Sequence, residues 1–212
     1  MRSRSITALL AALGFAVAGS TVAGCGVAPA PAPGKPAPAL PADSVAYDRL
    51  PVITTRAPLF PNSCAQFEQN PQLRSAFDVG STLFDPYGSV CVVTRQDGVQ
   101  VEVGAMNPTD RLPDPWTGTW GAYSYTLQHF RRSLVQDNHY YAVSTVENNG
   151  CVYSVNTGSS QVLQVAVKPG GDPGDYTPEH GREIGDKTCP GVQQLAETYL
   201  KIVDPGGGSL AG

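Results

Sequence analysis

The chain has 212 residues and a formal net charge of −4 at pH 7, so it is long enough for one ordinary domain and is modestly acidic. An acidic chain lacks the basic surface on which nucleic-acid binding and electrostatic docking to anionic lipid depend. We therefore expect no nucleic-acid partner.

The first 24 residues have the layout of a secretory signal peptide, because Arg2 and Arg4 give a positive start and an apolar stretch over residues 6–18 follows. That stretch is shorter than the roughly 20 residues that a membrane-spanning helix needs. Val22-Ala23-Gly24-Cys25 closes the segment and resembles the bacterial lipobox. The resemblance implies cleavage before Cys25, acylation of that cysteine, and a lipid anchor at the extracytoplasmic face of the cell membrane. The alternative is an ordinary secreted protein in which Cys25 happens to lie near the cleavage site.

Residues 25–59 are dominated by alanine, proline and glycine, a composition that cannot bury enough apolar surface to fold. We expect the lipidated cysteine to be followed by a flexible linker that holds the domain away from the lipid headgroups. A single disulfide-bonded domain should occupy residues 60–204, and residues 205–212 should form a flexible tail.

Four cysteines remain in this domain, namely Cys64, Cys91, Cys151 and Cys189. An even number outside the cytoplasm indicates two disulfides, for which three pairings are possible. We prefer the sequential pairing, Cys64 with Cys91 and Cys151 with Cys189. The cysteines and the three histidines lack the spacing of a metal site, so we expect no metal and no cofactor.

The domain should begin with a short helix near Cys64. Ser63 and Gln66 show the spacing of a capping box, and Pro71 should interrupt or restart the helix. The residues expected to be buried are Phe67, Leu73 and Phe77.

The clearest strand pattern follows a turn at Pro86-Tyr87-Gly88. Residues 89–96 form one apolar run, and in the next run valines alternate with polar residues at positions 99–103, so one face should be buried and the other wet. Asp97-Gly98 between the runs predicts a hairpin turn in which both residues have positive φ.

Residues 107–121 show no periodicity and contain several prolines, glycines and aspartates, so we expect a loop. Over residues 122–135 two templates compete. A strand would align Tyr123, Tyr125 and Leu127, whereas a helical stripe would align Tyr123, Leu127, Phe130 and Leu134. We prefer the helix because of the length of the segment.

Three strands should follow, over residues 140–146, 151–156 and 161–167, with turns at Asn149-Gly150 and Gly158-Ser159-Ser160. Residues 168–187 have the composition of a polar loop. Pro190 suits the first turn of a closing amphipathic helix, and Asp204-Pro205 should end it. The elements together predict an α+β domain with an antiparallel sheet of about five strands, in two hairpin units, and helices packed on one face.

Three stretches carry a resemblance to a known group: Asn62-Ser63-Cys64-Ala65-Gln66-Phe67, Ser89-Val90-Cys91-Val92-Val93 and Gly150-Cys151-Val152-Tyr153-Ser154-Val155. With Cys189 opening a helix rich in leucine and alanine, they resemble the small four-cysteine lipoproteins of unknown function of mycobacteria, nocardiae and streptomycetes. The resemblance covers residues 60–203 in the order and spacing of the elements. It implies an actinobacterial envelope protein and no activity, because the group has none established.

The sequence contains no Gly-x-Ser-x-Gly elbow, His-Glu-x-x-His motif or phosphate-binding glycine loop, so we expect no catalytic residues. His129, His139 and His180 stand in polar contexts, where histidines are usually surface residues. Asp172 and Asp175 fit turn chemistry better than a calcium loop.

The densest aromatic patch is formed by Trp116, Trp120 and Tyr123. Aromatic side chains on an exposed loop can anchor a partner, so these three are the candidate binding residues. The alternative is that the loop folds back and plugs the edge of a small core.

The expected function is that of a non-enzymatic binding or accessory module of the cell envelope. Its partners would be the membrane, through the lipid anchor, and a cell-wall component or another envelope protein. One alternative is an envelope hydrolase, which would need a pocket with a histidine within hydrogen-bond reach of a serine and a carboxylate. The other is a carrier of a small apolar ligand, which would need a dry cavity between sheet and helices.

Overall fold

A computed structural model describes residues 55–121, 129–147, 150–167 and 177–209, all of which lie in one compact unit, residues 37–212. The described residues form a seven-stranded antiparallel sheet and four helices, so the α+β class is confirmed and the expected count of about five strands is too low. The elements, in chain order, are α1 (Ala65–Gln69), α2 (Pro71–Ala76), β1 (Val79–Asp85), β2 (Val90–Arg95), β3 (Gln100–Met106), α3 (Pro115–Gly121), β4 (Phe130–Val135), β5 (Tyr140–Glu147), β6 (Gly150–Asn156), β7 (Val162–Val167) and α4 (Pro178–Val203).

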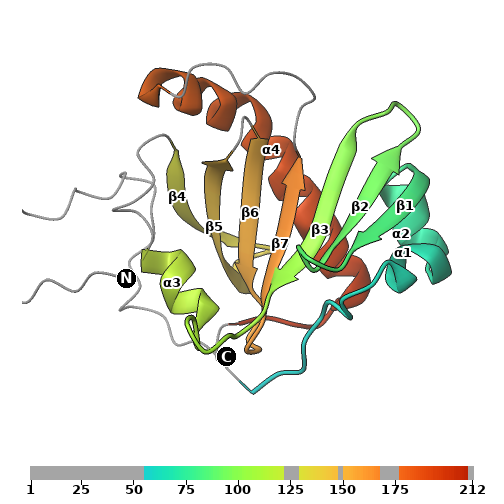
Figure 1. Cartoon of the computed structure of the whole chain (residues 1–212), viewed down its shortest axis with the longest axis horizontal. Helices are drawn as coiled ribbons and strands as arrows, with labels where there is room; N and C mark the ends of the chain where they lie inside the picture. The colour runs from blue at the N-terminus through green and yellow to red at the C-terminus, as the bar shows by residue number, and fades with distance from the viewer. Residues whose placement is uncertain (1–54, 122–128, 148–149, 168–176, 210–212) are drawn as a thin grey trace, which may run out of the picture. The chain divides into compact units, whose positions relative to one another are not determined.

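The sheet consists of two meanders in the strand order β1-β2-β3-β7-β6-β5-β4, and its neighbouring strands are antiparallel. The pairing of β3 with β7, in which Val103 lies opposite Val165, joins the two meanders (Figure 1). The expected hairpins β2–β3 and β6–β7 both form. In the first, Gly98 has a φ of 85°, but Asp97 does not take a positive φ, contrary to the prediction. The expected turn at Asn149-Gly150 lies partly outside the described residues.

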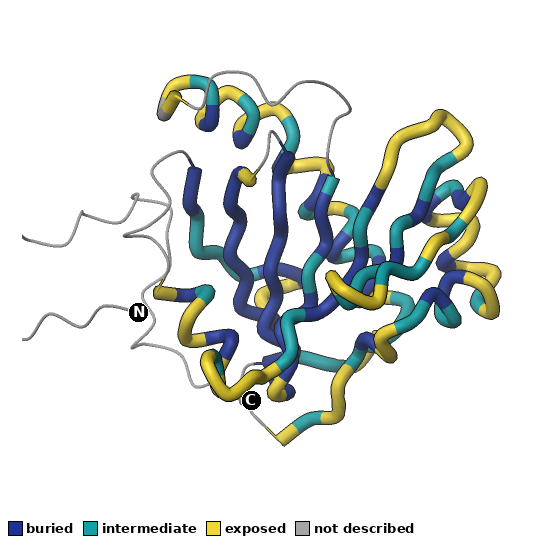
Figure 2. The backbone as a smooth tube through the Cα atoms, viewed as in Figure 1, coloured by how far each residue is buried: buried dark blue, intermediate teal, exposed yellow. Residues whose placement is uncertain are grey.

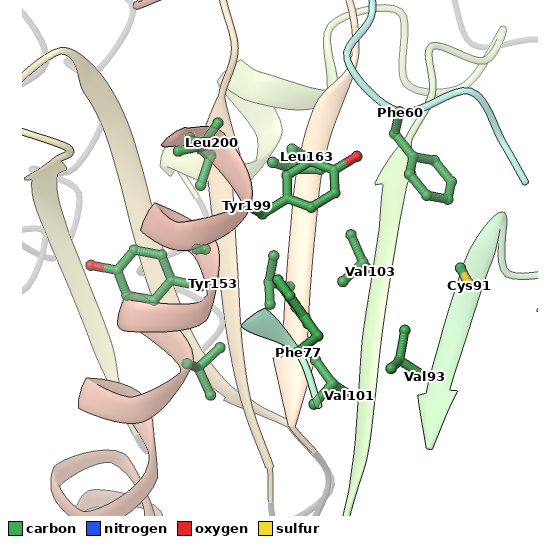
Figure 3. Packing of buried hydrophobic residues seen from close by; sticks show 14 of the residues in the cluster. Phe60, Phe77, Cys91, Val93, Val101, Val103, Tyr153, Leu163, Tyr199 and Leu200 are labelled. Atoms are coloured by element: carbon green, nitrogen blue, oxygen red, sulfur yellow. The ribbon is translucent and has the colours of Figure 1, made fainter. Parts of the chain in front are cut away.

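Helices α1, α2 and α4 cover one face of the sheet, and α4 crosses behind the strands in Figure 1, in contact with β5, β6 and β7. On α4, the ring of Tyr199 lies 6.0 Å from that of Phe67 and 6.5 Å from that of Phe77. These rings belong to one buried cluster with the inward valines of β2 and β3 (Figure 3). The burial of Phe67, Leu73 and Phe77 is therefore as predicted.

The first two helices are separated at Pro71, as expected, but the capping box does not form. No side chain caps α1 at Cys64, and the Gln66 amide instead donates to the carbonyl of Leu59 at 2.9 Å. Helix α2 has a true N-cap, because Asn70 Oδ1 accepts from the backbone N–H groups of its first turn.

Both disulfides fasten helices to this face of the sheet. Cys64 at the start of α1 is bonded to Cys91 on β2, and Cys151 on β6 is bonded to Cys189 on α4. This is the sequential pairing that the sequence analysis preferred. All four cysteines belong to the same buried cluster, so both bonds reinforce the core.

The opposite face of the sheet carries α3, which corrects the expectation that the helices lie on one face only. Residues 115–121 are helical instead of looped. Trp116 and Trp120 form a second buried cluster with Tyr141 and Val143 of β5, and Figure 2 shows β5 buried along most of its length.

Residues 130–135 form strand β4 and not a helix; residues 122–128 lie outside the described residues. Phe130 and Leu134 are four positions apart, a spacing that places two side chains on the same side of a helix and also on the same side of a strand. The pattern therefore could not separate the two structures. Pairing with β5, in which Leu134 lies opposite Tyr141, decides for the strand.

Helix α4 begins twelve residues before the predicted start at Pro190, since it spans Pro178–Val203. The local signals were present, because the Thr177 hydroxyl accepts from the N–H of His180 and a proline follows the cap. Pro190 instead lies inside the helix. Within the part of the chain that the structure describes, no helix is both long and apolar enough to cross a membrane.

The ends of the domain lie further out than the predicted bounds of 60 and 204. Arg56 donates two hydrogen bonds to the Asp204 carboxylate, at 2.7 and 2.5 Å. Beyond α4, the N–H of Ser209 donates to the carbonyl of His139 at 2.8 Å, and Ser209 is fully buried. Ser209 is therefore held against β5 and the turn before it, in contrast to the flexible tail expected over residues 205–212.

Candidate functional site

A hollow of about 300 Å³ lies on the sheet face opposite α4 and is the first candidate site. Two rows of register partners run beneath it. One row crosses five strands as Leu83, Val92, Glu102, Ala166 and Val152. The other is Asp85, Val90, Gly104 and Gln164. We call this site the sheet-face hollow; its described lining is Asp85, Gly88, Val90, Val92, Glu102, Gly104, Glu147, Val152, Gln164 and Ala166.

Two of the lining residues, Gly104 and Ala166, are small. A Cβ on Gly104 would lie 2.4 Å from Val90 Cγ1 and 2.7 Å from the carbonyl oxygen of Ser89, so no side chain fits there. Ala166 stands two residues along β7 from Gln164, the register partner of Gly104. Gly104 therefore lets the Val90 side chain and the Ser89 carbonyl lie close to the backbone of β3.

The lining of the hollow mixes apolar side chains with carboxylates, and one carboxylate, Glu102, lies in the middle of the first row. Val90, Val92, Val152 and Ala166 supply the apolar side chains, and Asp85, Glu102 and Glu147 supply the carboxylates. Two of the carboxylates have fixed positions: Asp85 Oδ1 accepts from the N–H of Tyr87 at 2.9 Å, and Glu147 Oε1 accepts from the Thr145 hydroxyl at 3.2 Å.

Two exposed apolar side chains flank the hollow. Leu83, whose register partner Val92 lines the hollow, is 70% exposed, and Tyr87, which lies between the lining residues Asp85 and Gly88, is 99% exposed. A partner that covered these two side chains would remove their apolar area from water. Sequence reasoning placed Tyr87 in a turn but missed the site, because the hollow brings together residues from six strands.

The predicted aromatic binding patch is not an exposed surface. Trp116 is 6% exposed and Trp120 is 3% exposed, and the Trp120 ring stands edge-on to Tyr141 at 5.2 Å. Arg132 covers the outer side of Trp120, with its guanidinium 4.7 Å from the ring centre. Both tryptophans therefore serve as core residues, and Tyr123 lies outside the described residues.

A second hollow, of about 350 Å³, lies between β4–β6 and α4. His129 and Ser144, which the fold buries to 6% and 4% exposure, meet here, with His129 Nε2 at 3.2 Å from Ser144 Oγ. Asp186 lines the same hollow and is exposed. The expectation that His129 is a surface residue is therefore wrong.

The remaining lining of this second hollow is mostly polar. Ser133 Oγ lies 2.8 Å from the hydroxyl of Tyr153, and Gln193 contributes an amide from α4. Burial raises the pKa of Tyr153, so its hydroxyl stays protonated at neutral pH. A polar hollow does not meet the requirement for a dry cavity, so it does not favour the carrier of an apolar ligand.

The other predicted positions do not gather into a site. His139 is exposed in the turn after β4, and His180 is half-buried in the first turn of α4. Among the described residues, no group of three histidine, cysteine or acidic side chains could hold a metal ion. Cys25, Asp172 and Asp175 lie outside the described residues.

Comparison of the chain with protein-family models, curated proteins and solved structures gave no significant match.

Proposed function

We propose that this protein is a membrane-anchored, extracytoplasmic lipoprotein that acts as a non-enzymatic binding or accessory module of the cell envelope. The lipid is carried by Cys25, and the contact surface is the sheet-face hollow with its neighbours Leu83 and Tyr87. The resemblance to the four-cysteine actinobacterial lipoproteins and the lipobox-like sequence support the anchor.

The observation that carries the binding role is the sheet-face hollow flanked by exposed Leu83 and Tyr87. An exposed leucine and tyrosine beside a valine-lined depression lose water-exposed area when a partner covers them, which favours binding. This surface replaces the tryptophans of α3, which are buried.

The position of the hollow suits an anchored protein. Arg56, which follows the linker, donates its N–H to the carbonyl of Gly158 in the β6–β7 turn. The pair Val152–Ala166 under the hollow lies four residues further along these strands than the pair Asn156–Val162, or about 13 Å at the rise of a strand. The Val152–Ala166 end of the hollow is therefore set back from this point, whereas Gln164, which also lines the hollow, lies two residues from Val162.

The anchor is tested by replacing Cys25 with alanine in the full chain. We expect labelled fatty acid to disappear from the protein and the protein to leave the membrane fraction, because the acylated thiol is lost. The variant Ser20→Ala, in the same segment, should remain labelled. Persistent labelling of the Cys25→Ala protein would refute the anchor.

The binding surface is tested by photo-crosslinking in intact cells, with a photoreactive phenylalanine analogue placed at position 87. We expect a discrete crosslinked product of higher mass from this position. The matched control is position 99, because Val99 is also an exposed large apolar residue, at 38% exposure, but does not line the hollow. Equal products from both positions, or none from position 87, would remove the hollow as the contact surface.

A second candidate function, an envelope hydrolase, is favoured by one observation: the contact between His129 Nε2 and Ser144 Oγ in a hollow that Asp186 also lines. The burial of Ser144 opposes it, because a substrate carbonyl would have to reach a hydroxyl that is 4% exposed. A fluorophosphonate probe, which labels activated serines, separates the two functions. Labelling that Ser144→Ala abolishes would establish the hydrolase, and a protein that stays unlabelled would exclude this site as its centre.

A further inference from the structure

We propose that the outer edge of β1 pairs with the same edge of a second copy of this chain, so that the two sheets join edge to edge. The two β1 strands would run antiparallel about Leu83, which would lie opposite Leu83 of the second copy. This inference goes beyond the proposed function, with which it shares only Leu83, and its partner is supplied by the chain itself.

The pairing within the sheet fixes which backbone groups of β1 point inward. Within the described sheet, β1 is an edge strand and pairs only with β2 (Figure 1). The Arg95 N–H donates to the carbonyl of Val99 in the β2–β3 hairpin. Because backbone groups alternate along a strand, the odd-numbered residues of β2 bond to β3 and the even-numbered ones bond to β1. Val92 is the register partner of Leu83, so the backbone groups of Leu83 point into the sheet.

The backbone groups of Thr82 and Phe84, on either side of Leu83, therefore point to the outer side of β1. No described residue forms a backbone hydrogen bond with them on that side. Buried backbone groups almost always have a partner, so the unpaired groups of this edge face water. A further strand can pair with them without displacing any contact among the described residues.

The two edges of the sheet differ in the features that discourage pairing. Natural edge strands are commonly protected by charged residues, prolines or bulges. The other edge strand, β4, carries Arg131 and Arg132. In β1 the shift of register lies at the start of the strand, between Val79 and Ser81, and the residues from there to Phe84 are regular and uncharged. β1 is therefore the edge that is open to another strand.

The residues of β1 complement one another when two copies meet about Leu83. Thr82 of each copy then lies opposite Phe84 of the other, so their outward backbone groups bond to each other. Leu83, which is 70% exposed, meets its counterpart at a position without backbone hydrogen bonds, where Cα atoms are about 4.5 Å apart and side chains are closest. Ser81 lies opposite Asp85, the charged residue of β1, so a hydroxyl faces each carboxylate and no like charges meet.

The pairing is tested by replacing Leu83 with cysteine in the full-length protein and treating whole cultures with a mild oxidant. A disulfide needs Cα atoms about 4.4–6.8 Å apart, so we expect a crosslinked product of double mass. The matched control is Val99→Cys, at an exposed apolar residue of the β2–β3 hairpin, which should stay monomeric. Thr82→Cys should also stay monomeric, because its counterpart would lie diagonally across the pair at about 7–8 Å.

An exchange of charge tests the same contact without a new cysteine. Two full-length copies with different tags are expressed together, and their co-purification is measured after detergent extraction. Leu83→Lys in both copies places like charges opposite each other and should reduce co-purification about tenfold. Leu83→Lys in one copy with Leu83→Glu in the other should restore it, which only folded proteins can do. Val99→Lys in both copies should co-purify like the unaltered protein.

The inference is overturned by unaltered copies that do not co-purify, by lysine and glutamate variants that do not recombine, or by equal crosslinking from positions 83 and 99. Crosslinking through Thr82→Cys in place of Leu83→Cys would overturn the register. A product of Leu83→Cys that contains another protein would show that a foreign strand occupies this edge.

These failures are distinguishable from failure of the proposed function. If the copies do not co-purify while position 87 still crosslinks to another protein, the proposed contact surface stands and only the second copy is removed as a partner. If the copies co-purify while position 87 gives no crosslink, the pairing of β1 stands and the sheet-face hollow is removed as the contact surface.

Discussion

Single glycines in this fold allow close approaches that a larger residue would prevent. Gly185 and Gly191 both lie within α4, but their surroundings differ. A Cβ on Gly185 would lie 2.3 Å from Nδ1 of the buried His129, whereas a Cβ on Gly191 would meet no atom within 4 Å. The first glycine therefore sets how closely α4 approaches the sheet, and the second only lowers the helical propensity.

Replacing each of these glycines with alanine should have opposite effects on stability. We expect Gly185→Ala to lower the free energy of unfolding by about 1–3 kcal/mol, because the new methyl group overpacks the His129 ring. Gly191→Ala should raise it by about 0.5–1 kcal/mol, because alanine favours the helix. Urea unfolding of both variants measures these changes, and a neutral effect of Gly185→Ala would show that the His129 ring can move aside.

At the scale of elements, the short helix α3 depends on its first residues and on its two tryptophans. Asp114 caps it, since its carboxylate accepts from the Thr117 N–H at 3.1 Å and from the Thr117 hydroxyl at 2.6 Å. These hydrogen bonds, that from the hydroxyl foremost, lower the pKa of Asp114. Both tryptophans of the chain, Trp116 and Trp120, lie in this helix, so tryptophan fluorescence reports directly on its packing.

The cap predicts a defined dependence on pH. The folded-state pKa of Asp114 lies below its unfolded value, so the stabilisation is complete above the unfolded pKa and is lost as the pH falls through the folded pKa. Asp114→Ala should therefore cost about 1 kcal/mol at pH 7, and this difference should shrink as the pH is lowered below about 4. Urea unfolding followed by tryptophan fluorescence measures it. The control Asp110→Ala removes an exposed aspartate of the preceding loop and should change the stability little at pH 7. A constant difference for Asp114→Ala across the pH range would contradict the cap.

At the scale of the whole molecule, three distant segments meet at Asp204 at the end of α4. Arg56 donates to Asp204 Oδ1 at 2.7 Å and the Tyr140 hydroxyl donates to Oδ2 at 2.6 Å. Arg56 also donates to the carbonyl oxygens of Thr157 and Gly208. Burial, together with the hydrogen bond to Asp204, raises the pKa of Tyr140, so its hydroxyl remains a donor at neutral pH.

Removal of this central carboxylate should loosen both ends of the domain. We expect Asp204→Ala to lower the free energy of unfolding by about 2–3 kcal/mol, because a half-buried guanidinium and a buried hydroxyl both lose their acceptor. The control Glu179→Ala breaks the exposed ion pair with Arg182 and should cost less than about 0.5 kcal/mol. Hydrogen exchange at Ser209, whose N–H bonds to His139, should accelerate in Asp204→Ala alone; equal exchange in both variants would contradict this role.

The disulfides act at the same scale, because each closes a loop between helix and sheet. Cys151 and Cys189 are 38 residues apart, and Cys64 and Cys91 are 27 apart. Replacing both Cys151 and Cys189 with serine should lower the free energy of unfolding by about 4 kcal/mol, because the unfolded chain regains conformational entropy. Replacing both Cys64 and Cys91 should lower it slightly less, because the loop that they close is shorter. Urea unfolding of the two double variants tests this order, and a loss below 1 kcal/mol for either pair would contradict it.

The sequence by itself determined the features that depend on local pattern. The alternating valines at 99–103 and the glycines at 98 and 158 predicted hairpins that form. The even number of cysteines predicted two disulfides, and the structure has the pairing that was preferred among the three possible ones. The apolar side of residues 192–203 likewise predicted a helix against the sheet. Periodicity, turn chemistry and cysteine order are properties of neighbouring residues, so the chain alone expresses them.

Only the tertiary structure decided the rest. The spacing of Phe130 and Leu134 fits both a helix and a strand, and the segment is a strand because it pairs with β5. The sequence predicted that the tryptophans of α3 bind a partner, but in the structure they are buried against β5. The sheet-face hollow forms only because β3 pairs with β7, which places Glu102 opposite Ala166. Contacts of this kind join residues tens of positions apart, and their energy depends on which surfaces meet, which no local pattern records.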